Sequence, residues 1–350
     1  MPKSESSKQI AKPASRIGVL QQRLESIWYK GAAGKQWLYP LELLYRGIAR
    51  LDRLLKRRKI IDHAVPVIIV GNISVGGTGK TPLVVFLCDL LKQAGYSPGI
   101  ITRGYGGNSA QGPVLVGIDS DSTVCGDEPV LMAQRSGVPV VAGPNRNADI
   151  QYLLAEGEVD VVISDDGLQH YRLQRDIEIA VIDQSRGLGN KHCLPAGPLR
   201  EPASRLDSCD FIVINEVEPV DVYSMQLMAS KVCRLNSLVE QPLSNWDERE
   251  VHAVTGIGNP SRFFYTLKNA GLAVIEHAFP DHYAFVESDI DFADELPVVM
   301  TEKDAVKCRQ FAMDKHWYLP VSASLSDRFS EDLLAKLAIV TAEKLKNQND

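Results

Sequence analysis

Short runs of β-branched and other apolar residues alternate with longer stretches of mixed polarity from Val65 onward. The short runs indicate strands, and stretches such as 81–94 and 146–157 indicate helices. This β-α-β alternation is typical of a parallel sheet covered by helices on both faces, and so predicts an α/β fold. The predicted strands are 65–70, 98–102, 138–142, 159–164, 178–183 and 210–214.

A smaller set of elements follows a stretch rich in Pro, Ser and Asn near 238–247. We place a domain boundary near residue 240, which gives a larger domain over 61–240 and a smaller α/β domain over 241–350. The predicted elements of the smaller domain are strands 251–255, 273–278, 297–301 and 317–321, with helices 261–270 and 329–347.

Residues 37–58 have the pattern of an amphipathic helix. At about 100° per residue, one arc of roughly 120° contains Leu41, Leu44, Tyr45, Ile48, Leu51 and Leu55. The opposite side carries Arg46, Arg50, Arg53 and Arg57. Such a helix suits the interface of an anionic membrane. A helix that packs on the domain core with its basic face in water would show the same pattern.

Positive charge is concentrated in this region. Residues 30–60 contain nine Lys or Arg against two acidic residues, whereas the whole chain has a net charge of -6. We therefore assign residues 17–60 to an N-terminal helical segment at a membrane interface. Residues 1–16 are rich in Ser, Lys and Pro without apolar periodicity, and are predicted to be a disordered tail.

The overall composition is that of a globular protein with room for two ordinary domains, since 45% of the 350 residues are hydrophobic and 23% are charged. The six cysteines lack C-x-x-C spacing, and the N-terminus does not resemble a secretory signal. We therefore expect neither a disulfide framework nor a structural zinc site, and a reducing cytoplasm as the compartment. No apolar stretch approaches the roughly 18 residues that span a bilayer, so a transmembrane protein is not expected.

The stretch GNISVGGTGKTP at 71–82 follows a predicted strand and resembles a phosphate-binding loop, the P-loop G-x-x-x-x-G-K-[ST], except that Ser74 stands at the first glycine position. Glycines allow backbone N–H groups to surround a phosphate at a helix N-terminus. Lys80 would reach the β- and γ-phosphates, and Thr81 would offer its hydroxyl to Mg²⁺. The alternative is a glycine-rich turn. The predicted nucleotide contacts are Gly76, Gly77, Thr78, Gly79, Lys80 and Thr81.

Asp165 and Asp166 come at the end of the predicted strand 159–164. Mg²⁺-nucleotide chemistry needs a carboxylate at the end of a neighbouring strand, so these two residues are predicted Mg²⁺ ligands. The alternative is an ordinary turn, because Asp-Asp-Gly is also favourable turn chemistry. Together with the P-loop, this pair predicts a P-loop NTPase-like sheet with flanking helices.

Three further stretches look like nucleotide motifs but do not fit them. GIGNP at 256–260 lacks the third glycine of a dinucleotide fingerprint and is interpreted as a strand-to-helix turn. RGYGG at 103–107 is interpreted as a loop. TEKD at 301–304 resembles a guanine-specificity motif, but no residue separates Lys303 from Asp304, which disfavours a GTPase.

Two functions remain compatible with these features. One is a kinase that acts on a lipid-like acceptor. The other is a membrane-associated switch ATPase, in which hydrolysis controls the binding of a protein partner. A kinase also needs an acceptor pocket and a base, so the second domain favours the kinase.

Several motifs, in their order and spacing, resemble the tetraacyldisaccharide 4'-kinase (lipid A 4'-kinase) family over roughly residues 20–325. Among them, SDDGLQHYRL at 164–173 and LPAGPLRE at 194–201 are specific to that family. Members of the family look like P-loop kinases without the leading glycine, so Ser74 fits. The other motifs that carry the resemblance are TRGYGG, GDEPVLMAQR, AGPNR, GIGNPSRFF, FPDHY and VMTEKDAVKC.

This resemblance implies transfer of the ATP γ-phosphate to the 4'-hydroxyl of a tetraacylated glucosamine disaccharide 1-phosphate, at the cytoplasmic face of a bacterial inner membrane. It implies Asp127 as the base, His282 as its partner from the second domain, and a site completed by domain closure. We expect a monomer with no nucleic-acid partner. Further residues that match active-site positions of the family are Glu128, Arg146, His170, Arg200 and Glu201.

Overall fold

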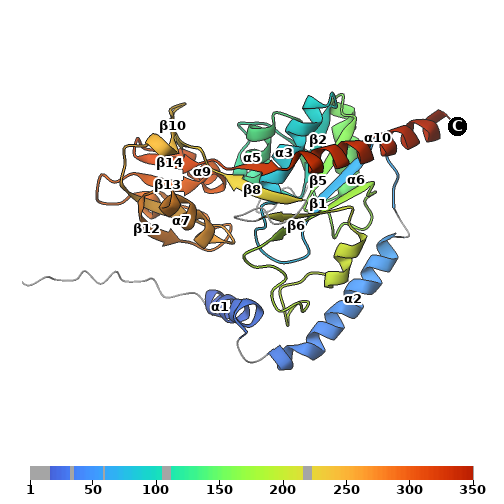
Figure 1. Ribbon diagram of the computed structural model, residues 1–350, viewed down its shortest axis with the longest axis horizontal. Coiled ribbons are helices and arrows are strands. Elements are labelled where there is room, and N and C mark those ends of the chain that lie inside the picture. The colour runs from blue at the N-terminus through green and yellow to red at the C-terminus, as the bar shows by residue number, and fades with distance from the viewer. Residues whose placement is uncertain (1–15, 32–34, 58–59, 105–111, 216–222, 350) are drawn as a thin grey trace, which may run out of the picture.

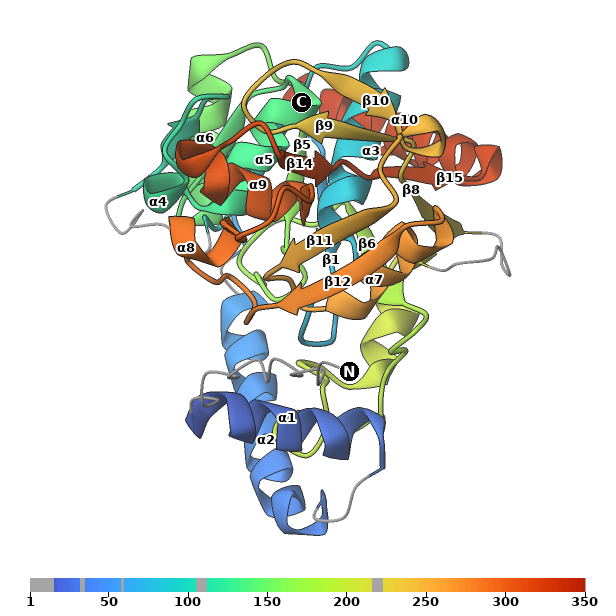
Figure 2. The same ribbon diagram turned by 90° about the vertical axis from the view of Figure 1, so that its left-hand side faces the viewer.

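The computed structural model describes residues 16–31, 35–57, 60–104, 112–215 and 223–349. Two sheets, each with its own helices, lie next to each other, and two N-terminal helices extend from the larger unit (Figures 1 and 2). Every strand and helix predicted from the sequence pattern is present, with its ends within two residues of the prediction. The predicted tail lies outside the described residues except for its last residue, and the RGYGG loop lies outside them beyond Gly104.

The larger sheet places the P-loop at the carboxyl end of its central strand β1. Alternate residues of β1 face opposite sides, so Ile68 and Val70 pack with one set of helices while Val67 and Ile69 pack against the other face. The strands of this sheet, in order, are β15 (Ser322–Leu325), β8 (Ser224–Met228), β7 (Phe211–Asn215), β6 (Ile177–Asp183), β1 (Val67–Gly71), β5 (Val161–Asp165), β2 (Pro98–Thr102), β4 (Val140–Ala142) and β3 (Val114–Val116).

All pairings in this sheet are parallel except those of β3 and β15 at its two edges. The carboxyl ends of β1 and β5 therefore lie side by side, which brings the P-loop next to Asp165 and Asp166. The principal helices of this unit are α3 (Lys80–Gln93), α5 (Asp127–Ser136), α6 (Arg146–Glu156) and α10 (Asp327–Asn349).

The smaller sheet has a mixed arrangement of six strands with apolar clusters on both faces. Its strands, in order, are β10 (Glu240–Pro242), β9 (Lys231–Arg234), β14 (His316–Leu319), β13 (Val298–Thr301), β11 (Glu250–Thr255) and β12 (Ala273–Ala278). The helices α7 (Pro260–Asn269), α8 (Glu287–Ile290) and α9 (Glu302–Cys308) complete this unit. GIGNP at 256–260 is the turn from β11 to α7, as interpreted from its sequence.

The strand pairing differs from the predicted 241–350 domain at both ends. The smaller sheet already begins with β9, before residue 240, and after β14 the chain returns to the larger sheet as β15 and α10. Phe329, Leu333 and Leu337 of α10 are buried in the same apolar cluster as β1. Periodicity identifies a local element but does not tell which sheet it packs on, so the pattern missed this return.

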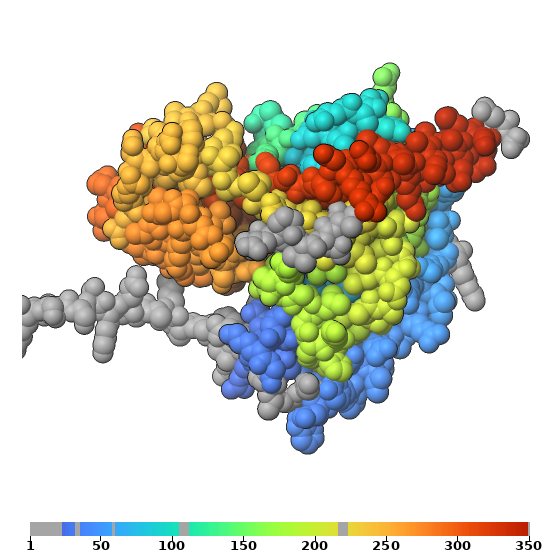
Figure 3. All heavy atoms as spheres, viewed as in Figure 1, coloured from blue at the N-terminus to red at the C-terminus, as the bar shows by residue number. Residues whose placement is uncertain are grey.

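The N-terminal helices α1 (Arg16–Tyr29) and α2 (Tyr39–Arg57) rest on the segment around residue 200, which is yellow-green in Figure 3. The indole N–H of Trp28 donates to the Pro195 carbonyl at 3.0 Å, and the Tyr45 hydroxyl donates to the Arg200 carbonyl at 2.8 Å. Glu42 of α2 is buried, accepts from the Cys193 amide at 3.0 Å and pairs with His192 at 2.9 Å.

The apolar arc of α2 faces away from the protein. Its leucine and isoleucine members are 52–61% exposed, and only Tyr45 turns inward. On the opposite side, Arg53 lies 3.5 Å from Glu201, and both Arg53 and Arg57 lie over the Tyr171 ring. The alternative in which the apolar arc packs on the core is therefore wrong, and part of the predicted basic face binds the protein instead of water.

We predict that Phe329→Ala lowers the free energy of unfolding of the larger unit by about 3 to 5 kcal/mol, because this fully buried ring contacts Phe86, Phe211 and Tyr223 and its removal leaves a cavity. Urea unfolding followed by tryptophan fluorescence and circular dichroism measures the change. Ile339→Ala, at a 61% exposed position of the same helix, is the matched control. Equal stability of the two variants would contradict the placement of α10 in this core.

Candidate active site

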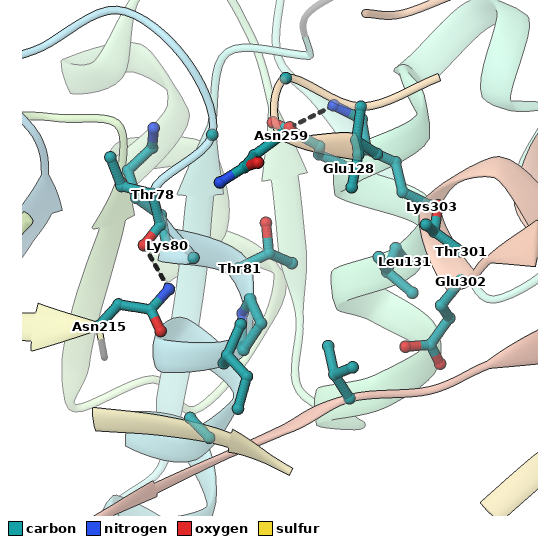
Figure 4. A pocket seen from close by; sticks show the side chains of 18 of the residues that line it. Thr78, Lys80, Thr81, Glu128, Leu131, Asn215, Asn259, Thr301, Glu302 and Lys303 are labelled. Carbon is teal, nitrogen blue, oxygen red and sulfur yellow. Dashed lines mark hydrogen bonds and ion pairs between the residues drawn. The ribbon is translucent and has the colours of Figure 1, made fainter. Parts of the chain in front are cut away.

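A cavity of about 510 Å³ lies between the carboxyl ends of the parallel strands and the smaller unit (Figure 4). Residues 76–82 line one side, and residues 257–259, 281–282 and 301–303 line the other. Such crevices at the carboxyl ends of strands are where open α/β sheets bind ligands. In Figure 4, Lys80 and Thr81 lie at the start of α3, and Asn259 and Lys303 reach toward them from the smaller unit.

The P-loop has the backbone that its glycines were predicted to allow. Gly76 and Gly79 have φ of 105° and 90°, in the region that favours glycine. A Cβ on Gly79 would lie 2.5 Å from the side-chain amide of Asn215, which itself donates to the Thr78 carbonyl at 2.9 Å. The amides that precede α3 therefore surround a space at a helix N-terminus, which favours an anion.

Asp166 joins the P-loop to the segment that carries Arg200. Its carboxylate lies 3.3 Å from Lys80 and 3.1 Å from Arg200. Burial opposes ionisation of this group, but the charges of Lys80 and Arg200 outweigh it and lower the pKa of Asp166. Asp166 also has a φ of 49°, which is uncommon outside glycine and is often found at functional sites.

Asp165 is buried at the end of β5, and its chemistry fits a magnesium site. The Thr102 hydroxyl donates to one of its oxygens at 3.2 Å, while the other has no hydrogen-bond partner among the described residues. Burial raises the pKa of Asp165 to about 7, which the nearby carboxylates of Glu128 and Asp166 reinforce and Lys80 opposes. A bound divalent cation would satisfy the unpartnered oxygen and favour the ionised form.

The described residues contain no cluster of three or more His, Cys, Asp or Glu that is arranged to hold a metal by itself. Mg²⁺ does not require one, because it binds through one or two carboxylates together with water and substrate phosphates. Thr81, Asp165 and Asp166 line the same cavity, so this donor set fits the predicted ion.

Asp127 and His282 meet across the two units, as predicted. Asp127 is the first residue of α5, and His282 lies in the loop after β12, with its Nδ1 3.5 Å from Asp127 Oδ2. Like Asp166, His282 has a positive φ, of 58°. The interaction with Asp127 raises the pKa of His282 against the effect of burial, whereas His282 and Lys303 lower the pKa of Asp127 although burial opposes them.

Four predicted site residues are not among those that line the 510 Å³ cavity: Asp127, Arg146, His170 and Glu201. Arg146 is 3% exposed and donates to the carbonyls of Gly143 and Asp165, at 3.1 and 3.2 Å. Arg146 therefore binds the backbone at the end of β5 and is not part of the cavity lining. Of the two predicted arginines, Arg200 is the one that lines the cavity and can contact a phosphate there.

His170 and Glu201 likewise do not line the cavity. Burial, together with the charge of Arg146, lowers the pKa of His170 to about 4, so its imidazole is neutral near pH 7. Glu201 is 6% exposed and accepts hydrogen bonds from Tyr171 and from Gln169, the latter at 3.0 Å. Glu201 thus links the segment that carries Arg200 to the loop that follows Asp166.

Sequence reasoning missed several residues that complete the site. Lys303 lines the cavity and lies 2.8 Å from Glu128 of the other unit. Asn215 and Arg262 also line it, and the Arg262 guanidinium donates to Asn215 at 2.5 Å. Asn215 ends a predicted strand, which is the signal that pointed to Asp165, but a lone amide there carries no chemical motif. Lys303 stands in TEKD, which was rejected as a guanine motif and otherwise used only as part of a family motif, without a role for the lysine.

Comparison with known proteins identifies relatives along most of the chain. The model of the family described as tetraacyldisaccharide-1-P 4'-kinase (LpxK) matches residues 34–338. A tetraacyldisaccharide 4'-kinase of Nitrosococcus oceani is 44% identical over 91% of this chain and 95% of its own length. One of Hahella chejuensis is 45% identical over 92% of this chain and 98% of its own length.

A solved structure has the same fold. The crystal structure of LpxK from Aquifex aeolicus in complex with ATP is 33% identical to this chain, with a TM-score of 0.72. The match covers 87% of this chain and 99% of the Aquifex chain. The P-loop NTPase-like α/β fold predicted from the sequence is therefore confirmed.

We predict that Lys80→Ala and Asp166→Ala each lower phosphotransfer by about a hundredfold or more, because both remove charge from a preorganised phosphate site. Activity is measured with saturating ATP, and thermal unfolding checks that each variant is folded. Asp160→Ala, on an exposed loop at the opposite end of β5, serves as the control. Near-normal activity of either site variant would refute this nucleotide site.

Proposed function

We propose how individual residues of this chain carry out catalysis. The chain belongs to the tetraacyldisaccharide-1-P 4'-kinase family. It is an ATP-dependent kinase of lipid A biosynthesis, which phosphorylates the 4'-hydroxyl of a tetraacylated disaccharide 1-phosphate. The observation that supports this most is that His282 of the smaller unit lines the same cavity as the P-loop and pairs with Asp127 of the larger unit.

The P-loop side holds the donor. The backbone N–H groups of residues 76–81 surround the phosphates, and Lys80 and Arg200 supply positive charge where negative charge develops. Thr81, Asp165 and Asp166 would hold Mg²⁺, which neutralises phosphate charge when it is bound. Asp166 presently pairs with Lys80 and Arg200, so these cations fix its carboxylate in place.

The other side activates the acceptor. Asp127 is ionised, because His282 and Lys303 lower its pKa, and it accepts the proton of the 4'-hydroxyl as the oxygen attacks the γ-phosphorus. The new bond joins that oxygen to phosphorus, and the bond to the β,γ-bridging oxygen breaks to release ADP. His282 orients Asp127 and shares the proton with it, so the two titrate as a pair.

Residues from both units must approach for this step. Gly258 lies so close to the P-loop that a Cβ there would be 2.9 Å from the Gly77 amide nitrogen, and Arg186 donates to the Gly258 carbonyl at 2.6 Å. The present arrangement is thus closed over the P-loop. We keep the predicted domains, 17–60, 61–240 and 241–350, as a functional division, with residues 231–240 reassigned to the smaller sheet and residues 322–349 to the larger unit.

We further propose that α2 seats the enzyme on the cytoplasmic face of the inner membrane as a peripheral protein. The seven exposed leucine and isoleucine side chains of α2 form an apolar surface with no protein partner among the described residues. No helix in the described ranges is long and apolar enough to cross a bilayer. A monomer without a nucleic-acid partner remains our prediction.

The function is tested by incubating the full-length protein with ATP and tetraacyldisaccharide 1-phosphate in detergent micelles. Mass spectrometry of the lipid is expected to show the gain of one phosphate. ATP hydrolysis that is independent of the lipid, without a phosphorylated lipid product, would instead favour the membrane-associated switch ATPase.

We predict that Asp127→Ala abolishes lipid phosphorylation but leaves ATP binding intact, because Asp127 is not among the residues that line the nucleotide cavity. A fluorescent ATP analogue measures binding, and mass spectrometry measures turnover. Loss of ATP binding would show that Asp127 is a nucleotide ligand and not the base.

We predict that replacing Leu44, Ile48 and Leu51 together by Ser releases the protein from anionic liposomes, because each buried apolar side chain contributes about 1.5 to 3 kcal/mol to insertion. These side chains are 59–61% exposed, so the folded core is unaffected. Co-sedimentation with liposomes measures binding, and kcat with a short-chain soluble acceptor should stay unchanged. A variant that still binds would place the membrane contact elsewhere.

A further inference from the structure

The TEKDAVK stretch at 301–307 places a second lysine beside Asp127, and its role is not explained by the nucleotide site. Lys307 Nζ of α9 lies 3.9 Å from Asp127 Oδ2. Lys303 approaches the same oxygen, at 4.0 Å, but it also lines the nucleotide cavity. Lys307 instead lines a separate cavity of about 570 Å³, to which Asp127 and His282 also contribute. Two ammonium groups therefore lie within about 4 Å of the same oxygen of Asp127.

Lys307 is held in this position by three contacts within the smaller unit. Its ammonium lies 2.8 Å from Asp304 Oδ1, donates to the Tyr283 carbonyl at 3.1 Å and lies 5.0 Å from the centre of the Phe285 ring. Its side chain is only 13% exposed. A lysine restrained in this way loses the conformational freedom of a surface lysine, so its charge has a defined place.

Asp304, which pairs with Lys307, also binds two other parts of the smaller unit that lie near the site. It is fully buried, and its Oδ2 accepts from the Gly256 amide at 2.9 Å and from the Thr301 hydroxyl at 2.6 Å. One carboxylate thus joins the turn that covers the P-loop, the start of α9 and Lys307. The three parts are therefore fixed relative to one another.

We propose that Lys307 is a positioning residue of the phosphoryl-transfer reaction: carried by Asp304, its ammonium holds the carboxylate of Asp127 ionised and correctly placed when the two units close. The proposal rests on the function of Asp127 as the base. It also explains why a second lysine is needed, because Lys303 is shared among Glu128, Asp281 and His282, at 2.8, 3.6 and 3.4 Å. Among the described residues, Asp127 is the only carboxylate of the larger unit within ion-pair distance of Lys307.

The charges around Asp127 set the sign of the expected pH effect. His282 faces it from the loop after β12, Lys303 and Lys307 face it from α9, and Glu128 follows it on α5. Asp119 and Asp121 lie on the wall of the cavity that Lys307 lines. Removal of one cation from this group raises the pKa of a carboxylate, so activity should begin to fall at a higher pH on acidification.

We predict that Lys307→Met lowers kcat for lipid phosphorylation by about tenfold, leaves KM for ATP within about twofold, and moves the acidic limb of the kcat/KM profile up by about one pH unit. Lys307→Arg keeps the charge and should retain activity within about threefold. The matched control is Lys315→Met. Lys315 is 18% exposed and held by Asp291 and by the carbonyls of Phe292 and Asp294, all within the smaller unit, so its loss should not change kcat.

A double-mutant cycle on the residual kcat of Asp127→Asn, measured at high enzyme concentration, separates this role from a structural one. If Lys307 acts through Asp127, the Lys307→Met change has no further effect on this residual kcat. Equal losses of kcat in both backgrounds, or an Arg variant as impaired as the Met variant, would overturn the proposal. Near-wild-type activity of the Asp127→Asn single variant would instead refute the base assignment, and an inactive wild type would refute the proposed function.

Discussion

The proposed catalytic site depends on the contact between Asp127 and His282. The two residues belong to different units, and they meet where the smaller unit lies over the P-loop. The same approach places Lys303 beside Glu128 and the 256–259 turn beside Gly77. In the proposed mechanism, a kinase with a lipid acceptor gains from this arrangement, because its base and His282 come together only where both units contribute to the site.

The segment from His192 to Glu201 connects this site to the proposed membrane surface. Its His192–Cys193 end binds Glu42 of α2. At its other end, the Arg200 carbonyl accepts from Tyr45 of α2, and the Arg200 side chain binds Asp166, which binds Lys80. Its backbone also pairs with the P-loop, since the Val75 amide donates to the Pro198 carbonyl at 2.9 Å. The orientation of α2 and that of the phosphate site are therefore fixed by one segment.

Local pattern predicted the parts of the structure that local residues determine. The apolar runs gave the central strands, and the glycines of the P-loop gave its backbone, because both depend on neighbours in sequence. Short edge strands such as β10 and β15 were missed, since they have few apolar residues and are defined by pairing with another strand. The pattern of α2 showed two faces, but Glu42 and its partners decide which one meets the protein, and those partners lie in a distant segment. In the same way, Arg146 and Glu201 match the family in sequence, but tertiary contacts keep both side chains out of the cavity lining.

The central claim is that Asp127 accepts a proton and does not itself take the phosphate, and the stereochemistry at phosphorus tests it most directly. The wild-type enzyme would transfer a γ-phosphate made chiral with isotopes of oxygen from ATP to the tetraacyldisaccharide 1-phosphate. A single in-line transfer to the hydroxyl, with Asp127 as the base, predicts inversion of configuration. Retention would indicate two successive transfers through a phosphorylated enzyme residue, and would contradict the account.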